Sequence, residues 1–120
     1  MEQSKRIGIL GEEFTAQKYR SMGYDVLTAN YNTRYGEIDI VFEKDDVVVI
    51  CEVKTRTNTS YTMPREAVTL DKQKKIISST KILMNDFKIT DKNIRFDVVE
   101  VIYINDDNMK INIIENAFIL

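Results

Sequence analysis

The sequence contains no histidine and only one cysteine, Cys51, and these absences exclude several kinds of site. Without histidine there is no Ser-His triad and no Cys-His catalytic pair, and the usual zinc sites lose their ligands. A single cysteine cannot form a disulfide framework. A metal ion would have to be held by oxygen atoms, which favours magnesium, manganese or calcium.

Long apolar runs are also missing. No segment approaches the roughly 20 apolar residues of a membrane span. The first residues, MEQSKRIGILGEEF, lack the long apolar stretch of a signal peptide. We therefore expect a cytoplasmic protein without membrane association. A composition of 43% hydrophobic and 30% charged residues is typical of a folded chain, and 120 residues predict one domain over 1–120.

Aromatic residues make up only 9% of the chain and are scattered, so no stacking platform for single-stranded nucleic acid stands out. Charge is unevenly spread: residues 54–81 carry seven basic and two acidic side chains, a net of +5, in a chain of net charge -2. Such a segment could bind phosphates, although a solvated helix face has the same composition. The side chains considered for nucleic-acid binding are Arg56, Lys72, Lys74 and Lys75.

The hydrophobic pattern predicts two helices. The first covers residues 4–22 and ends at Gly23. One half of its helical wheel is apolar, with Ile7, Ile9, Leu10, Phe14 and Ala16. Glu13 falls inside this half and Glu12 outside it. The second helix is expected to begin at Pro64 and to end near Phe87, with a break considered near Thr69.

Five strands are predicted from runs of β-branched and alternating apolar residues: 24–31, 36–42, 47–56, 93–104 and 109–118. The first three form a meander, and the second helix carries the chain across the sheet before the fourth strand pairs. The expected fold is α/β, with a central mixed five-stranded sheet flanked by helices and the order α-β-β-β-α-β-β.

Charged side chains gather where the second and third strands meet. A four-residue loop, EKDD at residues 43–46, would place Glu37 opposite Glu52 and Asp39 diagonal to Glu52. Any even-length loop puts four charged residues on one face: Glu37, Asp39, Glu52 and Lys54. An odd-length loop would divide them between two faces, and the sequence alone leaves it open. We prefer the even loop because it gathers all four where the apolar pattern of VVVICEVKTR breaks.

Carboxylates this close repel one another, which raises a pKa unless a cation neutralises them. A magnesium or manganese ion on Asp39 and Glu52, completed by water and substrate phosphate, would do so. Lys54 could then orient or activate an attacking water, or neutralise the scissile phosphate. The alternative is a strand-end ion pair of Glu52 and Lys54 with Asp39 exposed, and Glu13 as a boundary residue of the helix.

A helix glutamate, a strand aspartate and Glu-x-Lys on the partner strand resemble the PD-(D/E)XK nuclease pattern. More closely, GEEFTAQKYRSMGYDVLTANY, GEIDIV, CEVKTR, AVTLDKQKK and RFDVV together resemble the YraN-like family of small, largely uncharacterised bacterial proteins. That family is similar in fold to archaeal Holliday-junction resolvases. The resemblance covers nearly the whole chain and implies a restriction-endonuclease-like domain.

The resemblance also implies roles for particular residues. Glu13, Asp39, Glu52 and Lys54 would be catalytic, with the three carboxylates as ligands of Mg²⁺ or Mn²⁺, although Gly-Glu-Ile-Asp replaces the Pro-Asp of the superfamily pattern. Lys72 and Gln73 match a polar pair that could approach the phosphate backbone. Glu37 and Gln73 are accessory candidates, and we interpret Arg95 and Asp97 as mainly structural.

The leading hypothesis is a metal-dependent endonuclease that hydrolyses phosphodiester bonds of structured or branched DNA. Two alternatives stay open: a catalytically inactive nucleic-acid-binding module, and a protein-interaction domain with an incidental acidic cluster. The complete set of four catalytic candidates favours the enzyme, because a binding module has no need of all four. An isoelectric point near 5.2 counts against strong non-specific DNA binding. Structured DNA is the expected partner, and a homodimer is considered.

Overall fold

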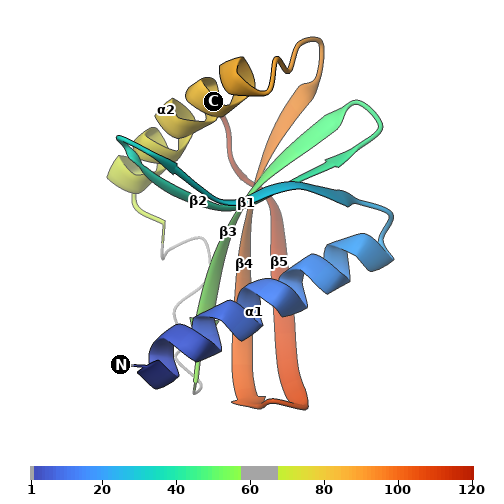
Figure 1. The fold of residues 1–120 in the computed structure, drawn as a ribbon, viewed down its shortest axis with the longest axis vertical. Helices are drawn as coiled ribbons and strands as arrows, with labels where there is room; N and C mark the ends of the chain where they lie inside the picture. Colours follow the sequence, from blue (N-terminus) through green and yellow to red (C-terminus); the bar gives the residue numbers. More distant parts are fainter. Residues whose placement is uncertain (1, 58–67) are drawn as a thin grey trace.

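The computed structural model describes residues 2–57 and 68–120, shown as coloured ribbon in Figure 1. The elements in this part of the chain follow the predicted order: α1 (Glu2–Ser21), β1 (Asp25–Thr33), β2 (Gly36–Lys44), β3 (Val47–Arg56), α2 (Leu70–Asp86), β4 (Asn93–Asn105) and β5 (Asn108–Phe118). The α/β prediction is confirmed. The helix start predicted at Pro64 lies outside the described residues, and Thr69 is the N-cap of α2.

The strands form one mixed sheet in the order β1-β2-β3-β4-β5. Neighbouring strands pair antiparallel except β3 and β4, which are parallel. The chain leaves the sheet at the end of β3, and the connection through α2 brings it back to the opposite end of the sheet, where β4 begins in the same direction as β3. This central parallel pair is covered on both faces, which explains the continuous apolar run from Val47 to Cys51.

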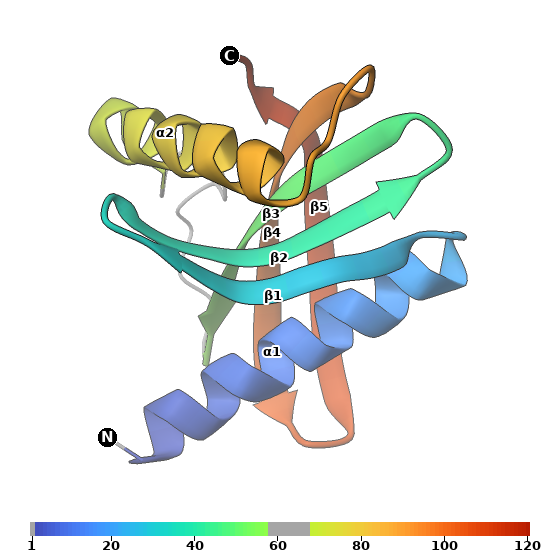
Figure 2. The ribbon, with the colours of Figure 1, turned by 45° about the horizontal axis from the view of Figure 1, so that its top comes forward.

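The two helices cover opposite faces of the sheet. Ile76 and Leu83 of α2 belong to a core with Val48 and Ile50 of β3. Tyr19 of α1 belongs to the other core, where its ring stacks on Phe42 with centroids 4.1 Å apart. Figure 2 shows β1 and β2 running between the two helices. Neither described helix is long and apolar enough to cross a membrane.

Helix α1 contacts the sheet through only part of the predicted apolar half: Ile7 is buried, and Phe14 and Ala16 pack against the core. Gly11, Thr15 and Tyr19 are buried at successive turns, whereas Ile9 is 50% exposed. The Thr15 hydroxyl donates to the Gly11 carbonyl at 2.8 Å, and the Tyr19 hydroxyl donates to Asp97 at 2.7 Å. The predicted inward face was wrong only in part, because the buried strip begins at Ile7 but continues through glycine and satisfied hydroxyl groups, which carry no hydrophobic signature.

The β2–β3 hairpin turns through two residues, not the four predicted. Lys44 pairs with Val47, so that the turn consists of Asp45, at a left-handed φ of 55°, and Asp46. The predicted pairing of Glu37 with Glu52 was therefore wrong by two positions. Since the loop length remains even, Asp39 and Glu52 stay on the same face, whereas Ile38 and Ile40 pack in different cores, so the alternation does not extend to Glu37. The β2–β3 register, continued one position past Ile40 and Cys51, brings Asp39 opposite Glu52.

Candidate functional site

Strands β2 and β3 separate at Asp39. Their regular pairing ends at Ile40 and Cys51. Beyond that point the Asp39 side chain takes over the role of a backbone partner, because its Oδ2 atom accepts a hydrogen bond from the Val53 N–H at 2.8 Å. This bond fixes the Asp39 carboxylate against β3, next to Glu52.

Glu52 is a buried carboxyl group in contact with a second one. The residue is 7% exposed, and its carboxyl group shares a hydrogen bond with that of Asp39. Burial, followed by the hydrogen bond and charge of Asp39, raises the pKa of Glu52 to about 8, against the opposing effect of Lys72. The raised pKa of Glu52 means that its negative charge is disfavoured here, and a divalent cation beside the two carboxyl groups would offset that cost.

Lys72 is the cation that the structure places on Glu52. Its Nζ atom lies 3.3 Å from Glu52 Oε1, and its side chain is 39% exposed. The first turn of α2 is held in place by Thr69, whose Oγ1 accepts from the Lys72 N–H at 3.2 Å. Lys72 was predicted to bind nucleic acid. The structure brings its amine onto Glu52 and leaves its side chain partly exposed to solvent, so nucleic-acid binding by Lys72 stays a prediction.

Lys54 lies two residues after Glu52 on β3, so its side chain projects from the same face. The strand-end ion pair of Glu52 and Lys54 that we considered is not formed, because Lys72 pairs with Glu52 instead. Opposite Lys54 on β4 lies Glu100, which is paired with Arg56 at 2.6 Å. Within residues 2–57 and 68–120, the Lys54 amine makes no ion pair.

A second acidic pair lies at the junction of α1 with the β1–β2 hairpin. Asn30, at a left-handed φ of 51°, donates from its amide to Glu37 at 2.8 Å and to Glu12 at 3.1 Å. Burial raises the pKa of Glu12, with smaller contributions from the charges of Asp39 and Glu37, while the Asn30 hydrogen bond lowers it. Glu12 is therefore the α1 carboxylate that lies near enough to Asp39 for the charge of Asp39 to raise its pKa.

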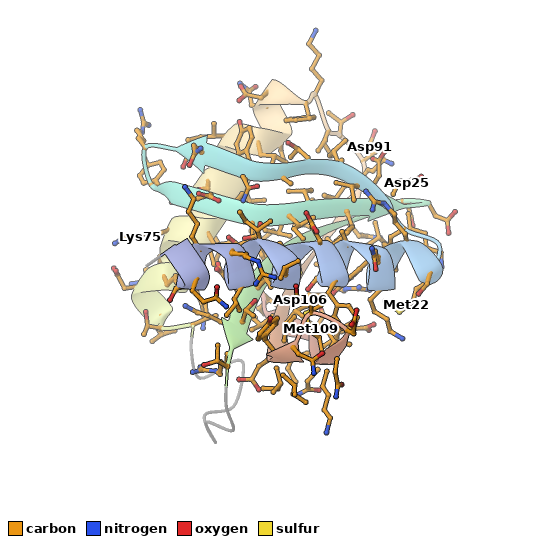
Figure 3. All side chains as sticks on the ribbon, turned by 60° about the horizontal axis from the view of Figure 1, so that its bottom comes forward. Met22, Asp25, Lys75, Asp91, Asp106 and Met109 are labelled. Atoms are coloured by element: carbon orange, nitrogen blue, oxygen red, sulfur yellow. The ribbon has the colours of Figure 1, made fainter. Side chains whose placement is uncertain are left out.

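Glu13 was predicted to approach the cluster, but within the described residues it makes no hydrogen bond or ion pair with Asp39 or Glu52. Glu13 is exposed and lines a hollow of about 360 Å³ together with Asp106 and Met109 of the β4–β5 turn. Figure 3 shows both of these residues beneath α1. On the other side of Glu13, a hollow of about 230 Å³ is shared with Glu12 and Asn30, so Glu13 lies at the outer edge of α1 between the cluster and β5.

The acidic side chains form two pairs, not one ring. In the part of the chain that the structure describes, no three Asp, Glu or Cys side chains converge to hold a metal ion. Asp39 and Glu52 offer carboxylate oxygens of the kind that Mg²⁺ binds, and Mg²⁺ commonly completes its shell with water and substrate phosphate. The residues thus fit a weak site with two protein carboxylates.

The other basic and polar candidates differ in their surroundings. Gln73 donates its amide to the Val68 carbonyl at 3.1 Å, and Arg56 is held by Glu100, so both have structural partners. Lys75 pairs with Asp71 at 3.2 Å on the exposed face of α2, where Lys74 is also exposed. Only Lys74 and Lys75 among these candidates present their charge to solvent, as a phosphate contact would require.

Arg95 and Asp97 are structural, as interpreted from the sequence. Asp97 is 1% exposed and accepts two hydrogen bonds from the Arg95 guanidinium, each at 2.9 Å. It also accepts from the Tyr19 hydroxyl and, at 3.2 Å, from the Asn116 N–H. The buried carboxylate thereby joins α1 to β4 and β5, with every contact satisfied inside the protein.

Two residues near the site were missed by the sequence reasoning, Glu12 and Asn30. The signal for Glu12 was available in the spacing of Gly11, Thr15 and Tyr19, which recur every four residues and place Glu12 at the edge of the strip. Asn30 carries a weaker signal, since asparagine tolerates the left-handed conformation that kinks a strand.

Comparison with known proteins gives relatives along nearly the entire chain. The model of the Uncharacterised protein family UPF0102 matches residues 11–101. A UPF0102 protein of Syntrophomonas wolfei is 44% identical over 118 residues, covering 96% of this chain and 99% of its own. Similar proteins of Alkaliphilus oremlandii and Clostridium perfringens are 43% and 38% identical over 117 and 116 residues, covering 96% of this chain and 99% and 95% of their own.

Proposed function

The chain belongs to the Uncharacterised protein family UPF0102, the YraN-like family indicated by its motifs, and we propose that it is a metal-dependent nuclease of structured or branched DNA. The observation that carries the proposal is the buried contact between the carboxyl groups of Asp39 and Glu52, with Lys54 next along the same face. Two touching carboxyl groups destabilise a sheet, and a cation that binds between them offsets this cost.

In the proposed mechanism Asp39 and Glu52 would hold a Mg²⁺ or Mn²⁺ ion, which would supply Lewis-acid chemistry for hydrolysis of the scissile phosphate. The Val53 N–H keeps the Asp39 carboxylate in its orientation, with one oxygen engaged. Lys54 positions the attacking water or neutralises the scissile phosphate. Lys72 stays at the rim and compensates the charge of Glu52 when its proton leaves.

A second candidate function is a nucleic-acid-binding module without turnover. One observation favours it: the described part of the chain offers two converging carboxylates, not three, and a lysine already pairs with one of them. In this case Lys72 would be the permanent counter-charge of Glu52, and the exposed lysines of α2 would contact the phosphate backbone.

A metal titration with branched and linear DNA separates the two functions. The nuclease should cut branched DNA in Mg²⁺ or Mn²⁺, and should bind without cutting in Ca²⁺ or EDTA. If the protein binds DNA but cuts no branched, flapped or single-stranded substrate in either metal, the nuclease proposal is contradicted and the binding module is supported. Absence of both binding and cleavage would contradict both. The homodimer stays a prediction, to be checked by sedimentation of the same protein.

A further inference from the structure

A pocket of about 240 Å³ lies between the tip of the β1–β2 hairpin and α2. The hairpin side is formed by Tyr35, Gly36 and Glu37, and the helix side by Asp71, Lys72, Lys75, Ile76 and Ser79. Figures 1 and 2 both show the hairpin tip against α2, and Figure 3 places Lys75 at this end of the molecule. The proposed active site and the pocket share a wall, because Lys72 lines the pocket and contacts Glu52.

The pocket is preformed by contacts at its closed end. The Thr33 and Ser79 hydroxyl groups lie 2.6 Å apart and join the hairpin to α2. The same Thr33 oxygen accepts from the Tyr35 N–H at 3.0 Å and also bonds to the Gly36 carbonyl at 3.1 Å, which fixes the turn. Gly36 has a φ of 140°, where only glycine is comfortable, and nothing lies within 4 Å of the place where its side chain would be.

The wall chemistry suits a flat, hydrogen-bonding ring. Tyr35 is 40% exposed, with the Arg34 guanidinium 5.1 Å from its ring centre. Ile76 adds apolar surface, and the carboxylates of Glu37 and Asp71 are acceptors for amino groups. The two lysines lie where a phosphate attached to that ring would need cations. A volume of 240 Å³ is below the range of about 300–1,000 Å³ typical of larger ligands.

We propose that this pocket binds the nucleobase of one unpaired nucleotide in the DNA strand that crosses the active site. The inference rests on the proposed nuclease function and specifies its substrate: DNA with an unpaired nucleotide beside the scissile phosphate, such as a flap, a bulge or a branch point. The base stacks on Tyr35, and its amino group donates to Glu37 or Asp71. Adenine and cytosine therefore bind better than thymine, which has no amino group.

The test compares three DNA duplexes that differ only at a single unpaired position, which carries adenine, thymine or an abasic sugar. Affinities are measured by fluorescence anisotropy in EDTA with the whole chain, so that cleavage does not interfere. The wild type should bind the adenine DNA about tenfold more tightly than the abasic DNA, as expected for one stacked base, with thymine between them. Tyr35→Ala should bind all three alike, whereas Tyr35→Phe should keep the order.

Phe87→Ala is the matched control, because Phe87 is 39% exposed at the C-terminal end of α2, away from the pocket. It should keep the wild-type order, and thermal unfolding should show that both alanine variants are folded. Equal binding of adenine and abasic DNA by the wild type, or an unchanged order in Tyr35→Ala, would overturn the proposal.

The same DNAs incubated in Mn²⁺ test the nuclease separately. A base preference without cleavage would support the proposed nucleobase pocket and contradict the proposed nuclease activity. Cleavage without base preference would refute the pocket alone. A wild type that binds none of the three DNAs would refute both.

Discussion

At the residue scale, the central feature is the environment of the buried Glu52 carboxyl group. A structural carboxylate in this chain, Asp97, is equally buried but is surrounded by donors: Arg95, Tyr19 and the Asn116 N–H. Glu52 instead faces another carboxyl group and one lysine at 3.3 Å. The contrast between two buried acids on adjacent strands indicates that the Glu52 environment is unfavourable for its charge and favourable for a cation.

The raised pKa of Glu52 predicts a pH-dependent stability. Its pKa is about 8 in the folded protein and has an ordinary value of 4.5, so between these pH values the folded state binds more protons than the unfolded chain. This contribution to the free energy of unfolding therefore falls as pH rises from about 4.5 to about 8 and is constant above. Glu52→Gln should remove it and be more stable than the wild type by about 1–3 kcal/mol at pH 9.

Urea unfolding in EDTA at pH 5 and pH 9 measures this difference. Glu13→Gln is the control, because Glu13 is exposed, and its stability should follow the wild type at both pH values. If the stability of Glu52→Gln relative to the wild type is the same at pH 5 and pH 9, the pKa of Glu52 is not raised by folding.

Glu12 and Glu13 give a second prediction from adjacent residues. Glu12 accepts a hydrogen bond from Asn30 and lies within electrostatic reach of Asp39, whereas Glu13 is exposed at the outer edge of α1. Glu12→Gln should therefore reduce single-turnover DNA cleavage by about tenfold or more, within the range found for removal of positioned acidic groups. Glu13→Gln should change it less than about twofold. A larger loss in Glu13→Gln would mean that α1 packs on the sheet through the face predicted from hydrophobicity.

At the element scale, the position of α1 depends on a close approach to β3. A Cβ atom added to Gly11 would lie 1.9 Å from the Thr55 hydroxyl oxygen, which is far inside contact distance. The helix can therefore reach the sheet only with glycine at this turn. Tyr19, two turns later, completes the docking by stacking on Phe42 and bonding to Asp97. Together these contacts set the rotation of α1, and with it the direction of Glu12.

Two glycines of α1 test this packing. Gly11→Ala should destabilise the protein by about 1–3 kcal/mol, because Thr55 is stiff and overpacking displaces the helix. Gly8→Ala should stabilise it by roughly 0.5–1 kcal/mol, since nothing lies within 4 Å of the added methyl group and alanine favours the helix. Thermal unfolding of both variants measures the difference. Equal effects of the two substitutions would contradict the close approach of α1 to β3.

At the scale of the whole molecule, the order of elements could be predicted because each strand carries its own local pattern. The shared face of Asp39 and Glu52 could be predicted because it depends only on whether the loop length is even. The turn length could not, since Asp45 adopts a left-handed φ that lets the strands extend to Lys44 and Val47. The parity argument was thus correct, although its pairing was wrong.

The contacts between the helices and the site could not be predicted from the sequence, for a different reason. The partner of Glu52 is Lys72, twenty positions along the chain. This contact depends on where α2 packs on the sheet through Ile76 and Leu83. The direction of Glu12 likewise depends on the docking of Gly11 on Thr55. Both are set by tertiary packing, which no periodicity of one segment encodes.

The central claim, that the Asp39–Glu52 pair and Lys54 form a catalytic site, is tested most directly by single-turnover cleavage of branched DNA in Mn²⁺ by Lys54→Ala. Lys110→Ala, an exposed lysine on β5, is the control, and affinity is measured separately in Ca²⁺. Lys54→Ala should lose cleavage by about 100-fold or more while its DNA affinity and thermal stability stay within about threefold and 1 kcal/mol of the wild type. Lys110→Ala should cut normally. Cleavage by Lys54→Ala at the wild-type rate would contradict the account.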